Sequence, residues 1–436
     1  MAATPHQVLV VGGGAAGVIT AAALLRGASA KLPLEVTVVE RSAVVGPGLA
    51  YVTTDPHHLL NNYAARMSAV DDDPHHLVQW CRSRGIAATG STFLSRETYG
   101  RYLGELLDAT PVPPGSSLVR VHDEVVDLTD AGSTYLATVA SGAVLTADTV
   151  VLALGNPPPR RPRGLDVDED RFVLDPWAPG LLERVGEHDR VLLVGTGLTT
   201  VDIAAQLASR RPGVRITATS RHGLLPLRHL PDPPGPAAVL PTAEVTLREA
   251  LGEVRRRLAA PDTEWRCVVE SVKAGFNDLW GRMRLTDRDR FLRHVSRRWE
   301  IARHRMSPAM GEVVDDLLAT GRLSIETGAV DVASYDLVVN CTGPAPVSAP
   351  GWNPLVDRLA LTGVLWPGPL GLGLDLDGEG ALIDAHGVGA RGIYAVGAAR
   401  RGVEWEVAAV PDLRRQAERL VRHLTAARRL EAEVAV

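Results

Sequence analysis

Short apolar runs alternate with amphipathic segments along the chain, and glycines follow several of these runs. Residues 8–11 are apolar throughout, which is typical of a parallel strand that is buried on both faces. Residues 18–25 have helical spacing, and residues 35–40 predict a second strand. This order of strand, helix and strand predicts the start of an α/β domain with a parallel sheet.

The same order returns later in the chain. Residues 191–194 predict a buried strand, a helix extends to Ser209, and residues 214–219 predict the next strand. Between about residues 243 and 330 the spacing is helical instead, which predicts a helical insertion. Further apolar runs are each followed closely by a glycine, namely Gly155, Gly343 and Gly397.

Three glycines between the first strand and the first helix match a dinucleotide-binding motif. In Gly12-x-Gly14-x-x-Gly17, the first glycine allows a tight turn, the second lets the backbone approach a pyrophosphate, and the third lets the helix pack close to the strand. The helix N-terminus presents free N–H groups to the phosphates. The next strand ends in Glu40, whose carboxylate can accept both ribose hydroxyls of an adenosine. We therefore predict a dinucleotide site here, rather than a glycine-rich turn without a ligand.

A second and looser match follows the strand at residues 191–194. Gly195-x-Gly197 is present, but Thr200 stands where the third glycine is expected. The following strand leads to Ser220 and Arg221 instead of a carboxylate, and a hydroxyl with a cation suits the 2′-phosphate of NADPH. The alternative is that Arg221 is a solvated loop residue. The two motifs predict two cofactors, FAD at the acidic first site and NADPH at the basic second site.

These patterns predict an α/β protein with two Rossmann-like dinucleotide-binding domains. Residues 1–155 and 336–436 are expected to form the FAD-binding domain. Residues 156–335 are expected to form the NADPH-binding domain, which carries the helical insertion.

Composition and charge narrow the class of protein. The net charge of −5 argues against a general nucleic-acid-binding surface. Cys81, Cys267 and Cys341 are widely separated, which predicts neither a disulfide framework nor a metal site. The chain shows no signal peptide and no apolar run of about 18 residues, so we expect a cytoplasmic protein that does not bind membranes. Neither the substrate nor the oligomeric state follows from the sequence.

Short motifs along the chain resemble a known family. These motifs are Gly48-Leu-Ala-Tyr51, Asp55-Pro-x-His58-Leu-Leu-Asn61, Met67-Ser68, Gly195-x-Gly197-Leu-Thr and Trp405-Glu. Together with the glycine turns, they resemble the bacterial FAD/NAD(P)-binding protein family of two-dinucleotide-binding flavoproteins, over nearly the whole chain. Some members of that family are similar to N-oxidising flavin monooxygenases of natural-product pathways.

The resemblance implies an NADPH-dependent monooxygenase that uses FAD and O₂ to oxygenate a small, amine-bearing substrate through a C4a-hydroperoxyflavin. The cofactor-binding residues predicted from the motifs and the resemblance are Gly12, Gly14, Ala15, Ala16, Gly17, Glu40, Arg41, Gly48, Leu49, Tyr51, Asn61, Val125, Gly155, Gly195, Gly197, Leu198, Thr199, Ser220, Arg221, Gly343 and Gly397.

Three further residues are expected to line the reactive end of the flavin. The loop at residues 51–68 is long enough to reach the ring from Glu40, and the late strand leads towards Trp405. We expect Asn61 to supply a hydrogen-bonding amide and Arg66 a cation for a substrate carboxylate. The alternative is that Asn61 only stabilises the loop and that Trp405 belongs to the core.

The sequence departs from the wider flavoprotein pattern. The late strand ends in Gly397-Ala398 rather than Gly-Asp, no redox cysteine pair is present, and no Phe-x-Gly-x-x-x-His motif precedes the second turn. Two alternatives to a monooxygenase stay open. One is an FAD-dependent NAD(P)H dehydrogenase or reductase that does not use O₂ on the substrate, and the other is a nucleotide-binding redox sensor without turnover.

Overall fold

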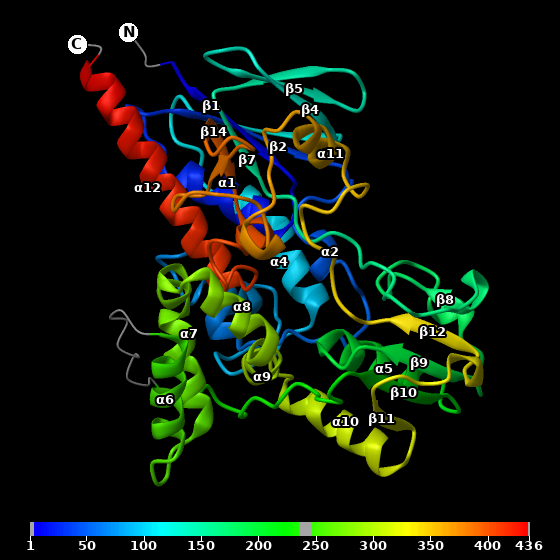
Figure 1. Ribbon diagram of the computed structural model, residues 1–436. Coiled ribbons are helices and arrows are strands. Elements are labelled where there is room, and N and C mark those ends of the chain that lie inside the picture. Colours follow the sequence, from blue (N-terminus) through cyan, green and yellow to red (C-terminus); the bar gives the residue numbers. More distant parts are fainter. Residues whose placement is uncertain (1–3, 236–245, 435–436) are drawn as a thin grey trace.

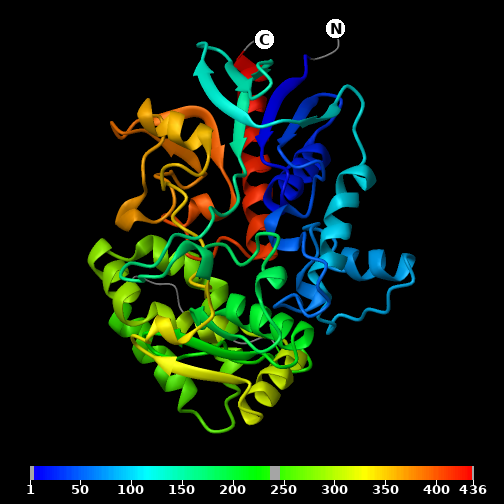
Figure 2. The ribbon, with the colours of Figure 1, turned by 90° about the vertical axis from the view of Figure 1, so that its right-hand side faces the viewer.

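The chain forms two parallel sheets that lie towards opposite ends of the molecule (Figure 1, Figure 2). The computed structural model describes residues 4–235 and 246–434. The first sheet has the order β13-β14-β7-β1-β2-β3, and all neighbours are parallel except β13 and β14. Its strands are β1 (His6–Val11), β2 (Leu34–Glu40), β3 (Ser117–His122), β7 (Thr149–Leu152), β13 (Ala381–Ile383) and β14 (Gly389–Ala395).

The second sheet is parallel throughout, with the order β11-β10-β9-β12-β8. Its strands are β8 (Phe172–Val173), β9 (Arg190–Val194), β10 (Arg215–Ser220), β11 (Leu323–Thr327) and β12 (Leu337–Asn340). A small antiparallel sheet packs on one face of the first sheet. It consists of β4 (Val125–Asp130), β5 (Tyr135–Val139) and β6 (Val144–Ala147).

Helices cover the remaining face of the first sheet and one face of the second sheet. Three of them, α1, α4 and α12, pack on the first sheet opposite β4–β6, while α5 and α10 pack on the second sheet. Within residues 4–235 and 246–434, no helix has both the length and the apolarity needed to cross a membrane. The helices are α1 (Ala15–Gly27), α2 (Gly48–Tyr51), α3 (His76–Ser83), α4 (Arg96–Ala109), α5 (Leu198–Arg210), α6 (Leu247–Leu258), α7 (Trp265–Arg282), α8 (Leu285–His294), α9 (Ser296–Arg303), α10 (Pro308–Ala319), α11 (Pro354–Leu361) and α12 (Val410–Val434).

The side chains of β1 alternate between two cores. Val8 and Val10 are buried with residues of α1 and α12, whereas Leu9 and Val11 are buried on the opposite face with residues of β4 and β5. A parallel strand that is covered on both faces has no position for a polar side chain, which explains the unbroken apolar run. The predicted α/β fold class with Rossmann-like sheets is confirmed.

The predicted domain boundary at residue 336 lies too early. It assigns β12 to the FAD-binding domain, but β12 pairs with β9 and β8 in the second sheet. The chain therefore leaves the second sheet only after Asn340. Because Gly343 follows β12 much as Gly155 follows β7, the local pattern does not show to which sheet each strand belongs. The other boundaries stay predictions.

The predicted helical insertion contains helices of two kinds. In the described part of the chain, α6–α9 form one core, which contains Trp280 of α7, Phe291 of α8 and the side chain of Trp405. Helix α10 instead packs on the second sheet. Residues 243–245 of the predicted range lie outside the described residues. In Figure 1, α6–α9 lie below the start of α12. The insertion therefore packs against the segment that follows β14.

The turn between β1 and α1 leaves almost no room for side chains. Gly12 has a φ of +104°, and a Cβ at this position would collide with the carbonyl oxygen of Ala153. A Cβ at Gly17 would collide with the carbonyl oxygen of Gly12, so the helix starts directly against the turn. Gly14 is different, because the nearest atom to a Cβ there is the Cα of Gly48, at 3.4 Å.

Because of this difference, we expect one glycine substitution to destabilise the protein and the other to leave its stability nearly unchanged. We expect Gly17→Ala to destabilise the flavin-free protein by about 1–3 kcal/mol, because the added methyl group forces α1 away from the turn. Gly14→Ser is the matched control, since serine is a favoured N-cap residue and its Cβ meets no close neighbour. Urea unfolding of both apoproteins measures the effect, and an equal loss of stability would contradict this account.

Candidate functional site

The first glycine turn presents free backbone donors. Gly14 is the N-cap of α1, it lies against the backbone of Gly48, and the first turn contains no acidic residue. The N–H groups of Ala15, Ala16 and Gly17 lie in this first turn, where an α-helix offers them no partner within the helix. A helix N-terminus of this kind attracts phosphate through these donors and through its partial positive charge.

Glu40 is held beside this turn by two backbone amides. Its Oε2 accepts a hydrogen bond from Gly13 N at 2.6 Å, and its Oε1 accepts one from Ser42 N at 2.8 Å. A Cβ at Gly13 would lie only 2.8 Å from the Cβ of Glu40. Gly13 is therefore a residue that the motif reading missed, although the unbroken run of three glycines could have indicated it.

Several other predicted residues surround the same turn. Gly48, in α2, approaches Gly14, and a Cβ at Gly397 would lie 3.5 Å from the Cβ of Ala16. The remaining predicted residues of this site lie in α2 (Leu49, Tyr51), after β2 (Arg41, which pairs with Glu124 at 3.4 Å), at the buried start of β4 (Val125) and after β7 (Gly155). The structure thus brings glycines of two other segments, Gly48 and Gly397, to the N-terminus of α1.

The second glycine turn departs from the motif at Thr200, and a hydrogen bond of that residue accounts for the difference. Gly195 has a φ of +128° and lies against the carbonyl oxygen of Cys341. The hydroxyl of Thr200 donates a hydrogen bond to the carbonyl oxygen of Gly195 at 2.8 Å, so it links α5 to the turn where a third glycine would let the helix pack directly. Gly197 has an open side, and the amides of Leu198 and Thr199 begin α5.

The basic end of β10 lies beside this turn. Ser220 Oγ lies 2.8 Å from Thr196 Oγ1 and accepts a hydrogen bond from Gly223 N at 3.0 Å. Arg221 is exposed, and in the described part of the chain it makes no hydrogen bond or ion pair. Arg297 of α9 reaches the same turn and donates to Thr196 Oγ1 at 2.9 Å. Burial lowers the pKa of Arg297, and no local sequence pattern could have linked it to a turn about 100 residues away.

The loop with Asn61 and Arg66 is held by the segment that follows β10 and by α7. His229 Nε2 donates to the carbonyl oxygen of Asn61 at 3.0 Å, and Tyr63 Oη donates to the carbonyl oxygen of Leu230 at 2.8 Å. Arg66 Nη1 lies 2.6 Å from Glu270 Oε2 on α7. Burial, with the charge of Arg305, lowers the pKa of His229 to about 3, which keeps this histidine neutral. Because Arg305 Nε donates to its Nδ1 at 3.3 Å, the ring proton lies on Nε2, which faces the carbonyl oxygen of Asn61.

Trp405 lies in the core between the helical insertion and the late segment. Its ring centroid is 5.0 Å from that of Trp280 and 5.1 Å from that of Phe291, and the residue is only 4% exposed. The side chain of Asn277 accepts from Trp405 N at 3.0 Å and from Glu406 N at 2.8 Å. The structure places Trp405 in this packing, and its contact with a flavin stays a prediction, as does that of Asn61.

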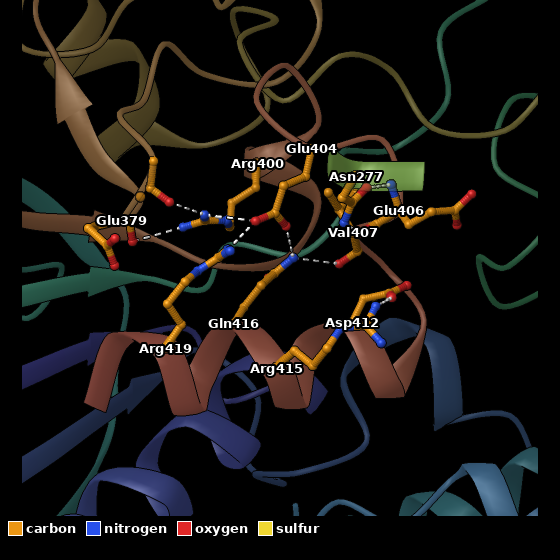
Figure 3. A network of polar contacts seen from close by, with 12 residues as sticks. Asn277, Glu379, Arg400, Glu404, Glu406, Val407, Asp412, Arg415, Gln416 and Arg419 are labelled. Atoms are coloured by element: carbon orange, nitrogen blue, oxygen red, sulfur yellow. Dashed lines mark hydrogen bonds and ion pairs between the residues drawn. The ribbon is translucent and has the colours of Figure 1, made fainter. Parts of the chain in front are cut away.

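A buried polar network holds the end of β14, where Ala398 stands in place of the expected aspartate (Figure 3). Ala398 offers no carboxylate, but Glu404 accepts from Arg400 Nη2 at 2.9 Å and also pairs with Arg419. Gln416 donates to Glu404 Oε2 at 3.1 Å and accepts from Gly397 N at 2.8 Å. The network joins α12 to the end of β14 and holds Gly397 at the N-terminus of α1.

Two parallel sheets, each with a glycine turn before its first helix, define a two-dinucleotide-binding flavoprotein fold. Residues 9–157 match the family model of FAD-NAD(P)-binding proteins, which confirms the predicted family resemblance and the predicted FAD and NAD(P) cofactors. No curated protein matches the sequence.

Solved structures share this fold over nearly their whole length. An ornithine N-hydroxylase from Kutzneria sp. 744 has a TM-score of 0.66 at 16% identity, covering 97% of this chain and 100% of its own. The cadaverine monooxygenase of the desferrioxamine pathway in Erwinia amylovora has a TM-score of 0.64 at 12% identity, with 97% and 95% covered. A bacillithiol disulfide reductase from Bacillus cereus has a TM-score of 0.56 at 13% identity, with 97% and 99% covered. At these identities the likeness concerns the fold.

The packing around Trp405 generates a test of its role. We expect Trp405→Ala to destabilise the protein by about 3–5 kcal/mol, because it leaves a cavity among Trp280 and Phe291. Trp405→Phe keeps an aromatic ring there and should retain most of the stability. Thermal unfolding of the FAD-loaded variants, with flavin content measured separately, checks this expectation. A Trp405→Ala variant that keeps wild-type stability but loses activity would instead favour contact with the flavin or the substrate.

Proposed function

We propose that the protein is an FAD- and NADPH-dependent monooxygenase that oxygenates a small amine. The observation that carries this proposal is the pair of glycine turns, one between β1 and the N-terminus of α1 and the other between β9 and the N-terminus of α5, together with a loop at residues 61–66 that is held in place. The fold shared with amine monooxygenases over the full chain length supports the reaction class.

The residues at the first turn fit FAD. The backbone of Gly14, which carries no side chain, and the amides of Ala15 and Ala16 suit its pyrophosphate, and Glu40 is hydrogen-bonded to the turn, where the adenosine ribose would lie. Gly397, held by Gln416, would lie beside the same phosphates.

The second turn fits NADPH. Gly197 and the start of α5 suit its pyrophosphate, and the free guanidinium of Arg221 suits its 2′-phosphate. Bound FAD, once reduced by NADPH, supplies the chemistry that activates O₂.

The chain's own residues then orient the substrate and limit the access of water. His229, Tyr63 and the Arg66–Glu270 pair fix the loop at residues 61–66 in place. Asn61 keeps its side-chain amide without a partner among the described residues, and an amide can both donate to and accept from a flavin or a substrate. Arg66 remains a candidate cation beside this position, although Glu270 already pairs with it.

Isotope labelling separates this proposal from its alternatives. With ¹⁸O₂ and an amine substrate, we expect one labelled oxygen atom in the product and NADPH consumption that depends on the substrate. Asn61→Ala should keep its FAD but turn over more slowly. An unlabelled oxidised product would indicate a dehydrogenase or reductase instead. NADPH consumption that no substrate stimulates would indicate a redox sensor.

The choice between NADPH and NADH depends on Arg221. We expect Arg221→Ala to raise the KM for NADPH by about ten- to a hundredfold and to leave that for NADH nearly unchanged, because a charge-assisted hydrogen bond to the 2′-phosphate is lost. Arg215→Ala is the matched control, since Arg215 is exposed at the opposite end of β10. Steady-state kinetics with both cofactors measure the effect, and equal changes for both would rule out this role.

A further inference from the structure

One face of α7 contacts the segment after β10, the loop at residues 61–66 and the segment that follows β14. Residues 266, 270, 273, 277 and 280 are spaced by four and three residues, so they lie along one side of the helix. Arg266 Nε donates to the carbonyl oxygen of Arg228 at 2.8 Å, and Trp280 Nε1 donates to that of Gly402 at 3.1 Å.

Between these ends, the same face binds the loop and the late segment. Glu270 pairs with Arg66 of the loop, and Asn277 makes three hydrogen bonds to the backbone of Trp405 and Glu406. Lys273 lies between Glu270 and Asn277, one turn from each. It therefore stands where the predicted flavin-lining segments come together.

Lys273 is the polar residue of this stripe that lacks a partner. Among the described residues its ammonium group makes no hydrogen bond or ion pair, and its side chain is partly exposed. Burial lowers the pKa of Lys273 to about 8, the charge of Arg303 acts in the same direction, and Glu270 and Asp412 oppose the shift. An ammonium group in such surroundings is costly unless an anion faces it.

The nearby carboxylates are already engaged. Glu270 pairs with Arg66 through Oε2 and with Arg305 through Oε1. Asp412 pairs with Arg415 through Oδ1, while its buried Oδ2 accepts no hydrogen bond from the described residues and lies 3.7 Å from Arg303. Among the described residues, the ammonium group of Lys273 is therefore a positive charge on this face that forms no ion pair with a carboxylate.

Lysine at position 273 is unusual for this chain. The chain contains 46 lysines and arginines, and all are arginines except Lys31 and Lys273. Lys31 is exposed at the surface, whereas Lys273 lies among three arginines and two carboxylates at the domain junction. An ammonium group differs from a guanidinium in being a compact point charge on a flexible stem, which suits a single carboxylate that arrives with a ligand.

We propose that Lys273 binds a carboxylate of the substrate, so that the substrate is a small amine that also carries a carboxylate group. This inference rests on the proposed monooxygenase function. The positive charges of Arg66, Arg303 and Arg305 around the same position disfavour a second ammonium group there. The site therefore favours amino acids over diamines.

Binding to the FAD-loaded protein tests this without turnover. Isothermal titration calorimetry compares 5-aminopentanoate with cadaverine, which share a primary amine on a five-carbon chain and differ at the other end. We expect the wild type to bind 5-aminopentanoate and not cadaverine. Lys273→Met should weaken the binding of 5-aminopentanoate by about ten- to a hundredfold, because a charge-assisted contact is lost. Lys273→Glu should reverse the preference towards cadaverine.

Two control variants distinguish the loss of the charge at position 273 from a general effect of substitution. Lys31→Met, at the other lysine of the chain, should bind as the wild type does, and Lys273→Arg should retain most of the affinity. Flavin content and the melting temperature verify that each variant is folded. Unchanged binding in Lys273→Met, absent binding of 5-aminopentanoate by the wild type, or a wild-type preference for cadaverine would overturn the inference. Binding that depends on Lys273 without oxygenation would instead sustain the inference and refute the monooxygenase function.

Discussion

The contact between the α-carbon of Gly17 and the carbonyl oxygen of Gly12 is the constraint on which the first site depends. Because no side-chain atom separates them, α1 begins directly after the end of β1, and its free amides face the region beyond the end of that strand. Glu40 lies close to this helix start because it accepts a hydrogen bond from Gly13, and Gly397 lies close to it because it approaches Ala16. On its other side α1 packs against α12, which carries the network that fixes the end of β14.

The parts of the fold that the sequence predicts well are those determined by neighbours in the chain. The glycine turns and the carboxylate at the end of β2 each depend on a few consecutive residues, and the structure has the two turns and Glu40 where they were expected. The membership of β12 could not be predicted in this way, because pairing with β9 is a long-range contact and an apolar strand followed by a glycine occurs in both sheets. Thr200 shows a similar limit, since only the structure reveals the hydroxyl contact that accompanies the loss of the third glycine.

The side chains between the two nucleotide turns were still less accessible to prediction. Arg297, Asn277 and Lys273 lie within helices whose spacing indicates only an amphipathic insertion. The partners of Arg297 and Asn277, namely Thr196 and Glu406, lie about 100 residues away or further. Trp405 was singled out by its motif, yet the motif could not show that Trp280 and Phe291 would enclose it.

The buried pairing of Arg303 with Glu406 and Asp412 ties the insertion to the loop before α12 and to the start of that helix. With α9 anchored there and by Arg297 at the second turn, the orientation of the neighbouring α7 does not depend on every residue that it carries. The inner face of α7 binds the loop and the segment around Trp405, whereas the two glycine turns are formed by other parts of the chain. On the proposal for Lys273, substrate choice and cofactor binding would thus be inherited on separate stretches of sequence, and specificity could change without rebuilding the glycine turns.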